Sequence, residues 1–196
     1  MVPLVHCEGG LITTVIIERY STGVPSLIMS SSQILPIAIT GEPILNRIAV
    51  KVSQFDASLI QLADDMLATM MAANGVGIAA GQVHSPLAMF VMASRPNERY
   101  PNAPVTEPRV IINPQILSYS TQTQAGIEGC LSIPDSRMSI VRSQQIDTRF
   151  QNLKGEFIEQ SFSDFEARIF QHEFDHIKGI TLIERLAQQQ KQAYPA

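Results

Sequence analysis

The chain has 196 residues, of which 45% are hydrophobic and 16% are charged, a balance that suits one globular domain with a hydrophobic core. Its formal net charge of -4 leaves no broad basic surface, so we expect no nucleic-acid partner. The two cysteines give no disulfide framework, and no apolar run reaches the roughly 20 residues of a membrane span. We therefore expect no membrane association and a reducing, cytoplasmic location.

Residues 1–32 differ from the rest and are predicted to be an N-terminal extension that is disordered or dispensable. The apolar run at 11–17 has no positive segment before it, and Arg19 is the only arginine nearby, which disfavours a signal or transit peptide. Met29 stands just before the region that follows, so we interpret it as the natural start. Detection of residues 2–28 in the native protein by mass spectrometry would refute this. Residues 33–196 are predicted to form a single domain.

The first predicted helix begins at Asp56, a residue type that often caps helices, and ends near Asn74 and Gly75. Its apolar residues recur at helical spacing and are interpreted as core: Leu59, Leu62, Met66, Leu67 and Met70. The glycine-rich run at 75–82 follows. It is not a dinucleotide-binding loop, because its glycine spacing differs and no strand precedes it.

Short strands are predicted over 87–92 and 109–117, separated by a loop at 95–108 that is rich in proline and asparagine. An extended segment around Cys130 is expected to stop at Pro134. Residues 145–153 and 156–162 are predicted to form a hairpin. A further short polar helix is expected from about Ile183.

A helix is predicted after Ser163, where Ser163 and Glu166 fit a capping box. Lys178 suits its negative end, and Gly179 suits the left-handed residue that closes it. The order of a helix, mixed short strands and a second central helix predicts an α+β fold.

That second helix carries an H-E-x-x-H run, from His172 to His176. Helical residues four apart share a face, so both imidazoles can reach one metal ion, and Glu173 can take a proton from a water on that ion. Phe165 and Ile169 continue the same stripe, which directs the histidines inward. One such histidine would more often be a core residue, whereas two with a glutamate between them indicate a metal site.

A catalytic site of this kind usually takes three protein ligands, so a third is required. The longer motif of some metallopeptidases would place a histidine at 182, but Leu182 stands there. Glu184, the only acidic residue further on, lies only eight residues after His176, whereas the carboxylate ligand of a metallopeptidase normally comes from a separate helix further along. A zincin-type metallopeptidase is therefore disfavoured, and the ligand is expected from upstream.

Cys130 and the pair His6 and Cys7 are the upstream candidates. A thiolate with two imidazoles is an accepted set for a divalent transition metal with an open position. Taken alone, Cys130 would more easily be a buried inert thiol. The competing pair lies near the N-terminus, in the predicted extension.

Three runs occur together and in order: G-x-G-x-A-A-x-Q at 75–82, E-G-C-L-S at 128–132 and Q-H-E-x-D-H at 171–176. Together they resemble peptide deformylase, which removes the formyl group from the N-terminal methionine of new polypeptides. The resemblance covers roughly residues 33 to 190. It implies a fold of mixed or antiparallel short-stranded sheets packed around a central metal-binding helix, and it makes 33–196 a deformylase-like catalytic domain.

The resemblance also implies the roles of individual residues. The metal ligands would be Cys130, His172 and His176, with a water in the fourth position. Glu173 would be the general acid and base, while the side-chain amide of Gln82 and the backbone N–H of Leu131 would stabilise the oxyanion. One Fe2+ ion per chain is implied, with Zn2+, Ni2+ or Co2+ able to substitute.

Further positions are expected to contact the substrate. Gly77 would pair with the main chain of the peptide, and Arg137 would face its downstream residues. Ile78, Phe165 and Ile169 would form walls of the methionine pocket. Glu128 would pair with Arg142 and support the cysteine loop.

The expected partners are N-formyl-methionyl nascent peptides, and we expect a monomer. Docking on the ribosome is not carried over, because the C-terminal segment is short and holds only Arg185 and Lys191 as cations. Gly81 departs from the proline that many relatives carry and should loosen the loop before Gln82. A deformylase-like binding module without activity is the remaining alternative, and the intact Glu173 argues against it.

Overall fold

The computed structural model describes residues 32–193. Nearly all of the predicted extension at 1–32 therefore lies outside the described residues, as do Met29 and the alternative ligand pair His6 and Cys7. Over 32–193, no helix is long and apolar enough to span a membrane.

Three α-helices, two short 3-10 helices and seven strands make up the described region. In chain order they are η1 (Pro43–Asn46), α1 (Ala57–Ala72), β1 (Gly77–Ala79), η2 (Ala80–Val83), β2 (Met89–Met92), β3 (Arg109–Tyr119), β4 (Thr123–Cys130), β5 (Ile133–Ser143), β6 (Gln145–Gln151), β7 (Phe157–Ser163), α2 (Asp164–Ile177) and α3 (Leu182–Ala193).

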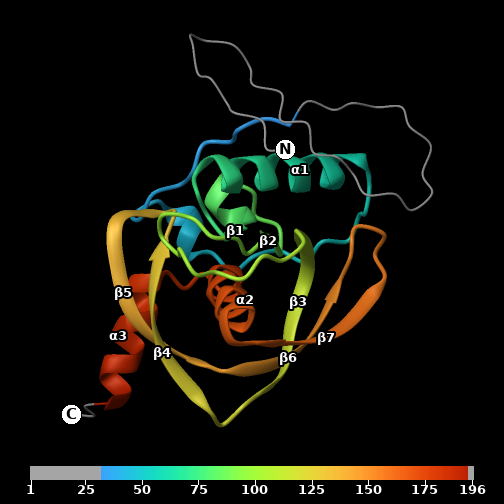
Figure 1. The fold of residues 1–196 in the computed structure, drawn as a ribbon. Coiled ribbons are helices and arrows are strands. Elements are labelled where there is room, and N and C mark those ends of the chain that lie inside the picture. The colour runs from blue at the N-terminus through green and yellow to red at the C-terminus, as the bar shows by residue number, and fades with distance from the viewer. Residues whose placement is uncertain (1–31, 194–196) are drawn as a thin grey trace.

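The strands form two antiparallel sheets. The larger has five strands in the order β1-β2-β3-β6-β7, and the smaller is the hairpin of β4 and β5. Figure 1 shows α2 in the middle of the molecule, with the β4–β5 hairpin and α3 on one side and β3, β6 and β7 on the other. The predicted α+β fold, with short-stranded sheets around a central helix, is confirmed.

The two long helices pack against opposite faces of the larger sheet. Side chains alternate along a strand, so Val91 of β2 joins the cluster beneath α1, whereas Phe90 joins the cluster around α2. Both residues are buried, at 1% and 0% exposure. The continuous apolar sequence of β2 follows from burial on both faces, and it fixes the sheet between the helices.

The predicted start of α1 is confirmed. The Asp56 carboxylate accepts hydrogen bonds from the backbone N–H groups of Ser58 and Leu59, which have no partner inside the helix. Leu59, Met66 and Met70 are buried in the cluster beneath the helix, as the core interpretation of this stripe requires.

The bounds of α2 agree with the prediction, but its predicted capping box is wrong. Ser163 is the last residue of β7 and caps no N–H group with its side chain. Glu166 pairs with Arg109 of β3 instead, and the chain enters the helix through Asp164, where φ is 50°. The predicted closing residue is confirmed: Gly179 has a φ of 70°, and its N–H donates to the carbonyl of His176.

The hairpin predicted over 145–162 is confirmed as β6 and β7. The longer β4–β5 hairpin was not predicted, and Pro134 does not end an extended segment as expected. It is the second residue of β5, next to an irregular pairing in which Cys130 lies opposite Ile133. A proline is tolerated there because the strand begins beside a bulge, where its missing N–H breaks no regular ladder.

Candidate active site

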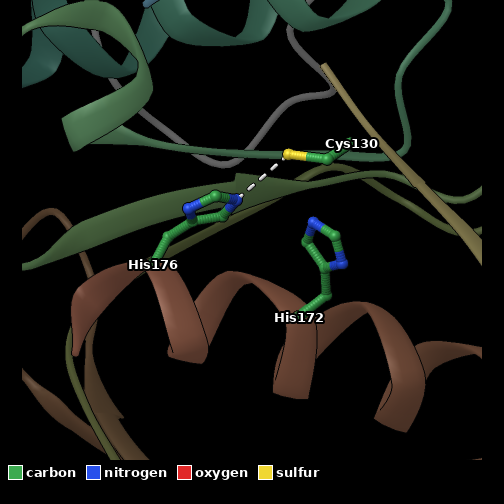
Figure 2. Close-up of side chains that lie close together, drawn as sticks. All are labelled: Cys130, His172 and His176. Atoms are coloured by element: carbon green, nitrogen blue, oxygen red, sulfur yellow. Dashed lines mark hydrogen bonds between the residues drawn. The ribbon is translucent and has the colours of Figure 1, made fainter. Parts of the chain in front are cut away.

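The structure brings the three proposed metal ligands together from two separate elements. His172 and His176 lie one turn apart on α2, and Cys130 ends β4 across from them (Figure 2). One sulfur and two ring nitrogens of these residues lie within 4.8 Å of one another, and Cys130 Sγ is 3.3 Å from His176 Nε2.

This donor set fits a single transition-metal ion. Bonds of about 2.1 Å to nitrogen and about 2.3 Å to sulfur in a tetrahedron place the ligand atoms about 3.4–3.6 Å apart, so small side-chain movements suffice. Two imidazoles and a thiolate leave a fourth position for a small molecule. Glu173 Oε2, buried beside them, has no hydrogen-bond partner within residues 32–193, as expected of a group that faces that position.

The surroundings of Cys130 favour the thiolate form of its side chain. Its burial opposes ionisation, but the charge of His176 and hydrogen bonds with both imidazoles hold its pKa well below the ordinary value. Because a thiolate is the form that binds metal, these surroundings favour the ligand state.

The orientation of His172 is set by Glu128, which is 2% exposed. Glu128 Oε2 lies 2.9 Å from His172 Nδ1, so the other ring nitrogen, Nε2, is left to face Cys130. Arg142 donates to both carboxylate oxygens at 3.0 and 2.9 Å, which confirms the predicted pairing of Glu128 with Arg142. Burial raises the pKa of Glu128, but the hydrogen bonds from His172 and Arg142 outweigh it and hold that pKa well below its ordinary range.

Glu173 lies on the same helix and is 3% exposed. Burial raises the pKa of its carboxyl to about 7, against the opposing charges of the two histidines. A carboxyl that titrates near neutrality can both accept and return a proton. Gly77 makes room for it, since a Cβ there would stand 2.3 Å from Glu173 Oε1.

Gln82, in η2, is 1% exposed, and its side-chain amide is held in one orientation. Its Oε1 accepts a hydrogen bond from the Ala79 N–H at 2.9 Å, and its Nε2 donates to Ser132 Oγ at 3.0 Å. Nε2 also lies 3.5 Å from Cys130 Sγ. The amide donor is therefore directed at the region beside the Cys130 sulfur, where Leu131 also lines the cleft.

A cleft opens over these groups, and some but not all of the predicted substrate residues line it. Gly77, Phe165 and Ile169 line the cleft. Ile78 does not, because neighbouring residues of a strand point to opposite faces and its fully buried side chain packs under α1. Arg137 does not line it either: its guanidinium lies over the ring of Tyr100, at 4.9 Å.

Several residues of the cleft wall were given no role by the sequence analysis, among them Val76, Arg99, Tyr100 and Arg168. Arg99 and Tyr100 come from the loop at 95–108, and the Tyr100 hydroxyl accepts a hydrogen bond from the Gly129 N–H. Arg168 comes from α2, one turn before His172. No local pattern marks the loop residues, whereas Arg168 lies four residues before a proposed ligand and so had a helical signal.

The only acidic residue after His176 in the described chain is accounted for without a metal. Glu184 accepts hydrogen bonds from Asn46 and from Thr181 at the start of α3. It lies outside the group of candidate metal ligands, which agrees with the sequence analysis, where a zincin-type site was disfavoured. A helix-borne H-E-x-x-H run, a cysteine from a separate hairpin, a buried glutamate and a fixed amide together fit the centre of a metal-dependent amide hydrolase.

Comparison with known proteins gives the family. A model of the polypeptide deformylase family matches residues 34–192. Peptide deformylase 2 of Shewanella oneidensis is 59% identical over 151 residues, which cover 77% of this chain and 83% of that protein. Peptide deformylase 2 of a Nostoc species is 46% identical over 155 residues, 79% of this chain and 87% of that protein.

Solved structures agree. A class I type b peptide deformylase of Acinetobacter baumannii, bound to Met-Ala-Ser, superposes with a TM-score of 0.77 at 47% identity, covering 79% of this chain and 99% of that one. The Thermotoga maritima peptide deformylase gives 0.71 at 37% identity, covering 78% and 97%. The chain belongs to the polypeptide deformylase family. It is a metal-dependent hydrolase that removes the N-formyl group from nascent peptides.

Proposed function

We propose that Cys130 Sγ and Nε2 of His172 and His176 hold one Fe2+ ion per chain, with Zn2+, Ni2+ or Co2+ able to replace it. The support is the convergence of these three donors and the ionised state that the surroundings favour for Cys130. When bound, the ion polarises the formyl group and lowers the pKa of a nearby water. The thiolate is the softest of the donors and suits all four ions.

Glu173 is the proton carrier of the proposed reaction. As a water attacks the formyl carbon, Oε2 of Glu173 accepts its proton. The same carboxyl then donates that proton to the departing amine, so formate and a free methionine amino group are released. The support is the pKa of about 7, together with a buried oxygen that has no partner within residues 32–193.

Gln82 and Leu131 stabilise the negative charge that develops on the formyl oxygen. The Gln82 amide is already oriented by Ala79 and Ser132, so it does not have to reorganise during the reaction. The backbone N–H of Leu131 is the second proposed donor. Loss of one such donor typically costs about 2.7–4 kcal/mol of transition-state stabilisation.

Phe165 and Ile169 are proposed as walls for the methionine side chain, since both are apolar and line the cleft beside the ligands. Gly77 is proposed to pair with the peptide main chain. Arg137 remains a candidate for the downstream residues of the peptide, because it contacts Arg99 and Tyr100, which line the cleft.

The cellular setting is proposed from the same features. Formylated nascent peptides are the substrate class, and we propose a cytoplasmic monomer as the working enzyme. Direct ribosome docking through α3 is not part of the proposal. Arg185, one of its two cations, is bound to Asp175 of α2.

The mechanism can be tested with protein purified anaerobically with ferrous iron. Formate release from a formyl-methionyl dipeptide is measured for the wild type and for Glu173→Gln, which keeps the shape of the side chain but removes its basicity. Glu159→Gln is the matched control, because Glu159 is a 59%-exposed carboxylate of β7. We expect Glu173→Gln to lose about 10²–10⁴-fold in kcat. Equal rates for it and the wild type would refute the role of Glu173.

The ligand set is tested by metal content. We expect Cys130→Ala to retain no stoichiometric metal, measured by elemental analysis after gel filtration. A variant that still holds one ion per chain would show that the third ligand is wrongly assigned.

A further inference from the structure

The proposed metal ligands belong to two units that share no strand pairing. Cys130 belongs to the β4–β5 hairpin, which pairs only with itself among the described strands, and the two histidines belong to α2. The distance between the thiolate and the imidazoles therefore depends on how the hairpin is held against the helix.

Arg168 joins these two units. It lies on α2 one turn before His172 and is 8% exposed. Its guanidinium donates to three acceptors on the hairpin: Glu128 Oε1 at 2.8 Å, the Ile140 carbonyl at 2.9 Å and the Gln124 carbonyl at 2.6 Å. These acceptors come from both strands, so one side chain of the helix contacts β4 and β5 at once; Arg142 to Asp175 and Gln171 to Ser143 join β5 to the helix as well.

Gly126 makes room for this arrangement. A Cβ on Gly126 would lie 2.7 Å from the Cζ atom of Arg168 and 2.8 and 2.9 Å from two of its nitrogens. Gly126 is paired with Ile140, whose carbonyl Arg168 contacts. The guanidinium of Arg168 thus occupies the space that a side chain at position 126 would need.

The contact of Arg168 with Glu128 extends to a proposed metal ligand, His172. Glu128 Oε1 is shared by Arg168 and Arg142, while its Oε2 contacts Arg142 and Nδ1 of His172. The two oxygens together engage four donors, which is about the full capacity of a carboxylate. Movement of Arg168 would therefore shift the group that orients His172.

We propose that Arg168, accommodated by Gly126, is a positioning residue that sets the placement of Cys130 relative to the imidazoles of α2. This inference rests on the ligand set proposed above. Arg168 acts through the hairpin and through Glu128, so it changes how tightly and in what geometry the metal is held.

A double-mutant cycle tests the proposal in cobalt-loaded full-length protein. Arg168→Met, Gly126→Ala and the double variant are compared with Arg149→Met, which removes an exposed arginine of β6. The readouts are the Co2+ absorption spectrum, including its thiolate charge-transfer band, and the metal dissociation constant from chelator competition. The urea midpoint of each protein reports on folding.

We expect Arg168→Met to weaken metal binding by about 10–100-fold and to shift the cobalt spectrum, as removal of a group that orients a ligand does. Gly126→Ala should give a similar loss, because Ala displaces the guanidinium. In the Arg168→Met background, Gly126→Ala should weaken metal binding little further. Wild-type metal affinity and spectrum in both single variants would overturn the proposal, as would full additivity of the two losses.

Two further variants separate the possible failures. If Arg168→Met is insoluble, Arg168→Lys replaces it, because lysine keeps the charge but cannot reach both strands at once; wild-type binding by that variant overturns the proposal. Cys130→Ser tests the underlying ligand set: it should abolish the thiolate band. If that band persists, the ligand set has failed, whereas a lost band together with an unaltered Arg168→Met spectrum rejects the positioning role alone.

Discussion

Substitution of Gly77 by alanine should remove most of the activity while leaving the fold and the metal site intact. A Cβ at this position would lie 2.3 Å from Oε1, 2.8 Å from Cδ and 2.9 Å from Cγ of Glu173. Ordinary contact begins at 3.4 Å, so the carboxylate must retreat by the difference, about 1 Å. The atoms displaced belong to the end of a flexible side chain, which can move without disturbing the backbone.

The expected loss follows from that displacement. A misplacement of about 1 Å in a reacting group can cost about 10²-fold in rate, so we expect kcat to fall by that factor. The assay is formate release under anaerobic conditions, together with metal content and the thermal midpoint. Gly81→Ala is the matched control, because it lies in the same glycine-rich run and a Cβ there meets only the Ile44 carbonyl, at 3.9 Å.

Gly77→Ala can also affect substrate binding, an effect separate from the displacement of Glu173. Gly77 is also proposed to pair with the substrate main chain, and loss of that pairing would raise KM. In a Glu173→Ala background the carboxylate is absent, so Gly77→Ala should lower kcat no further. Activity within threefold of wild type for Gly77→Ala alone, or a further fall in kcat in the Glu173→Ala background, would refute the steric argument.

Three other predictions concern stability and are read from urea unfolding of the purified protein. Gly81→Ala should stabilise the fold by about 0.4–1 kcal/mol, because the site has room and the unfolded chain loses freedom; destabilisation would show that Gly81 needs its flexibility. Asp56→Ala should cost about 0.5–2 kcal/mol by leaving the first N–H groups of α1 uncapped, with Asp56→Asn restoring most of it. Gly179→Ala should cost at least about 1–2 kcal/mol, since its φ is 70° and a Cβ would stand 2.8 Å from the Asn46 carbonyl; an unchanged midpoint would contradict this.

The part of the site that lies on α2 could be predicted from the sequence, because it depends only on local structure. His172 and His176 are four residues apart, so a helix alone places them on one face, and Glu173 follows with them. The ends of α1 and α2 were also predictable, because Asp56 and Gly179 act within one turn of their own positions.

The hairpin half was much harder to predict. The residues of β4 from Thr123 to Ala125 are exposed and polar or small, so no apolar alternation marks them as a strand. The family resemblance implied a place for Ile78 in the pocket, whereas the period of a strand turns its side chain to the other face. Tyr100 reaches the cleft from a loop in which a local turn is held by Asn97, and no apolar period predicts where that turn lies in the fold.

The two histidines of the motif are equivalent in sequence but not in the structure. His172 is held by Glu128, and through it by Arg142 and Arg168, so its orientation is set by the protein. His176 Nδ1 and Glu173 Oε2 are the buried side-chain atoms that have no hydrogen-bond partner within residues 32–193. Glu128 and its two arginines therefore fix one imidazole, whereas the other imidazole and Glu173 each keep a buried polar atom without a hydrogen bond within residues 32–193. A base that must first accept and then return a proton is suited by an oxygen without such a partner, because a fixed hydrogen bond to it would favour one protonation state over the other.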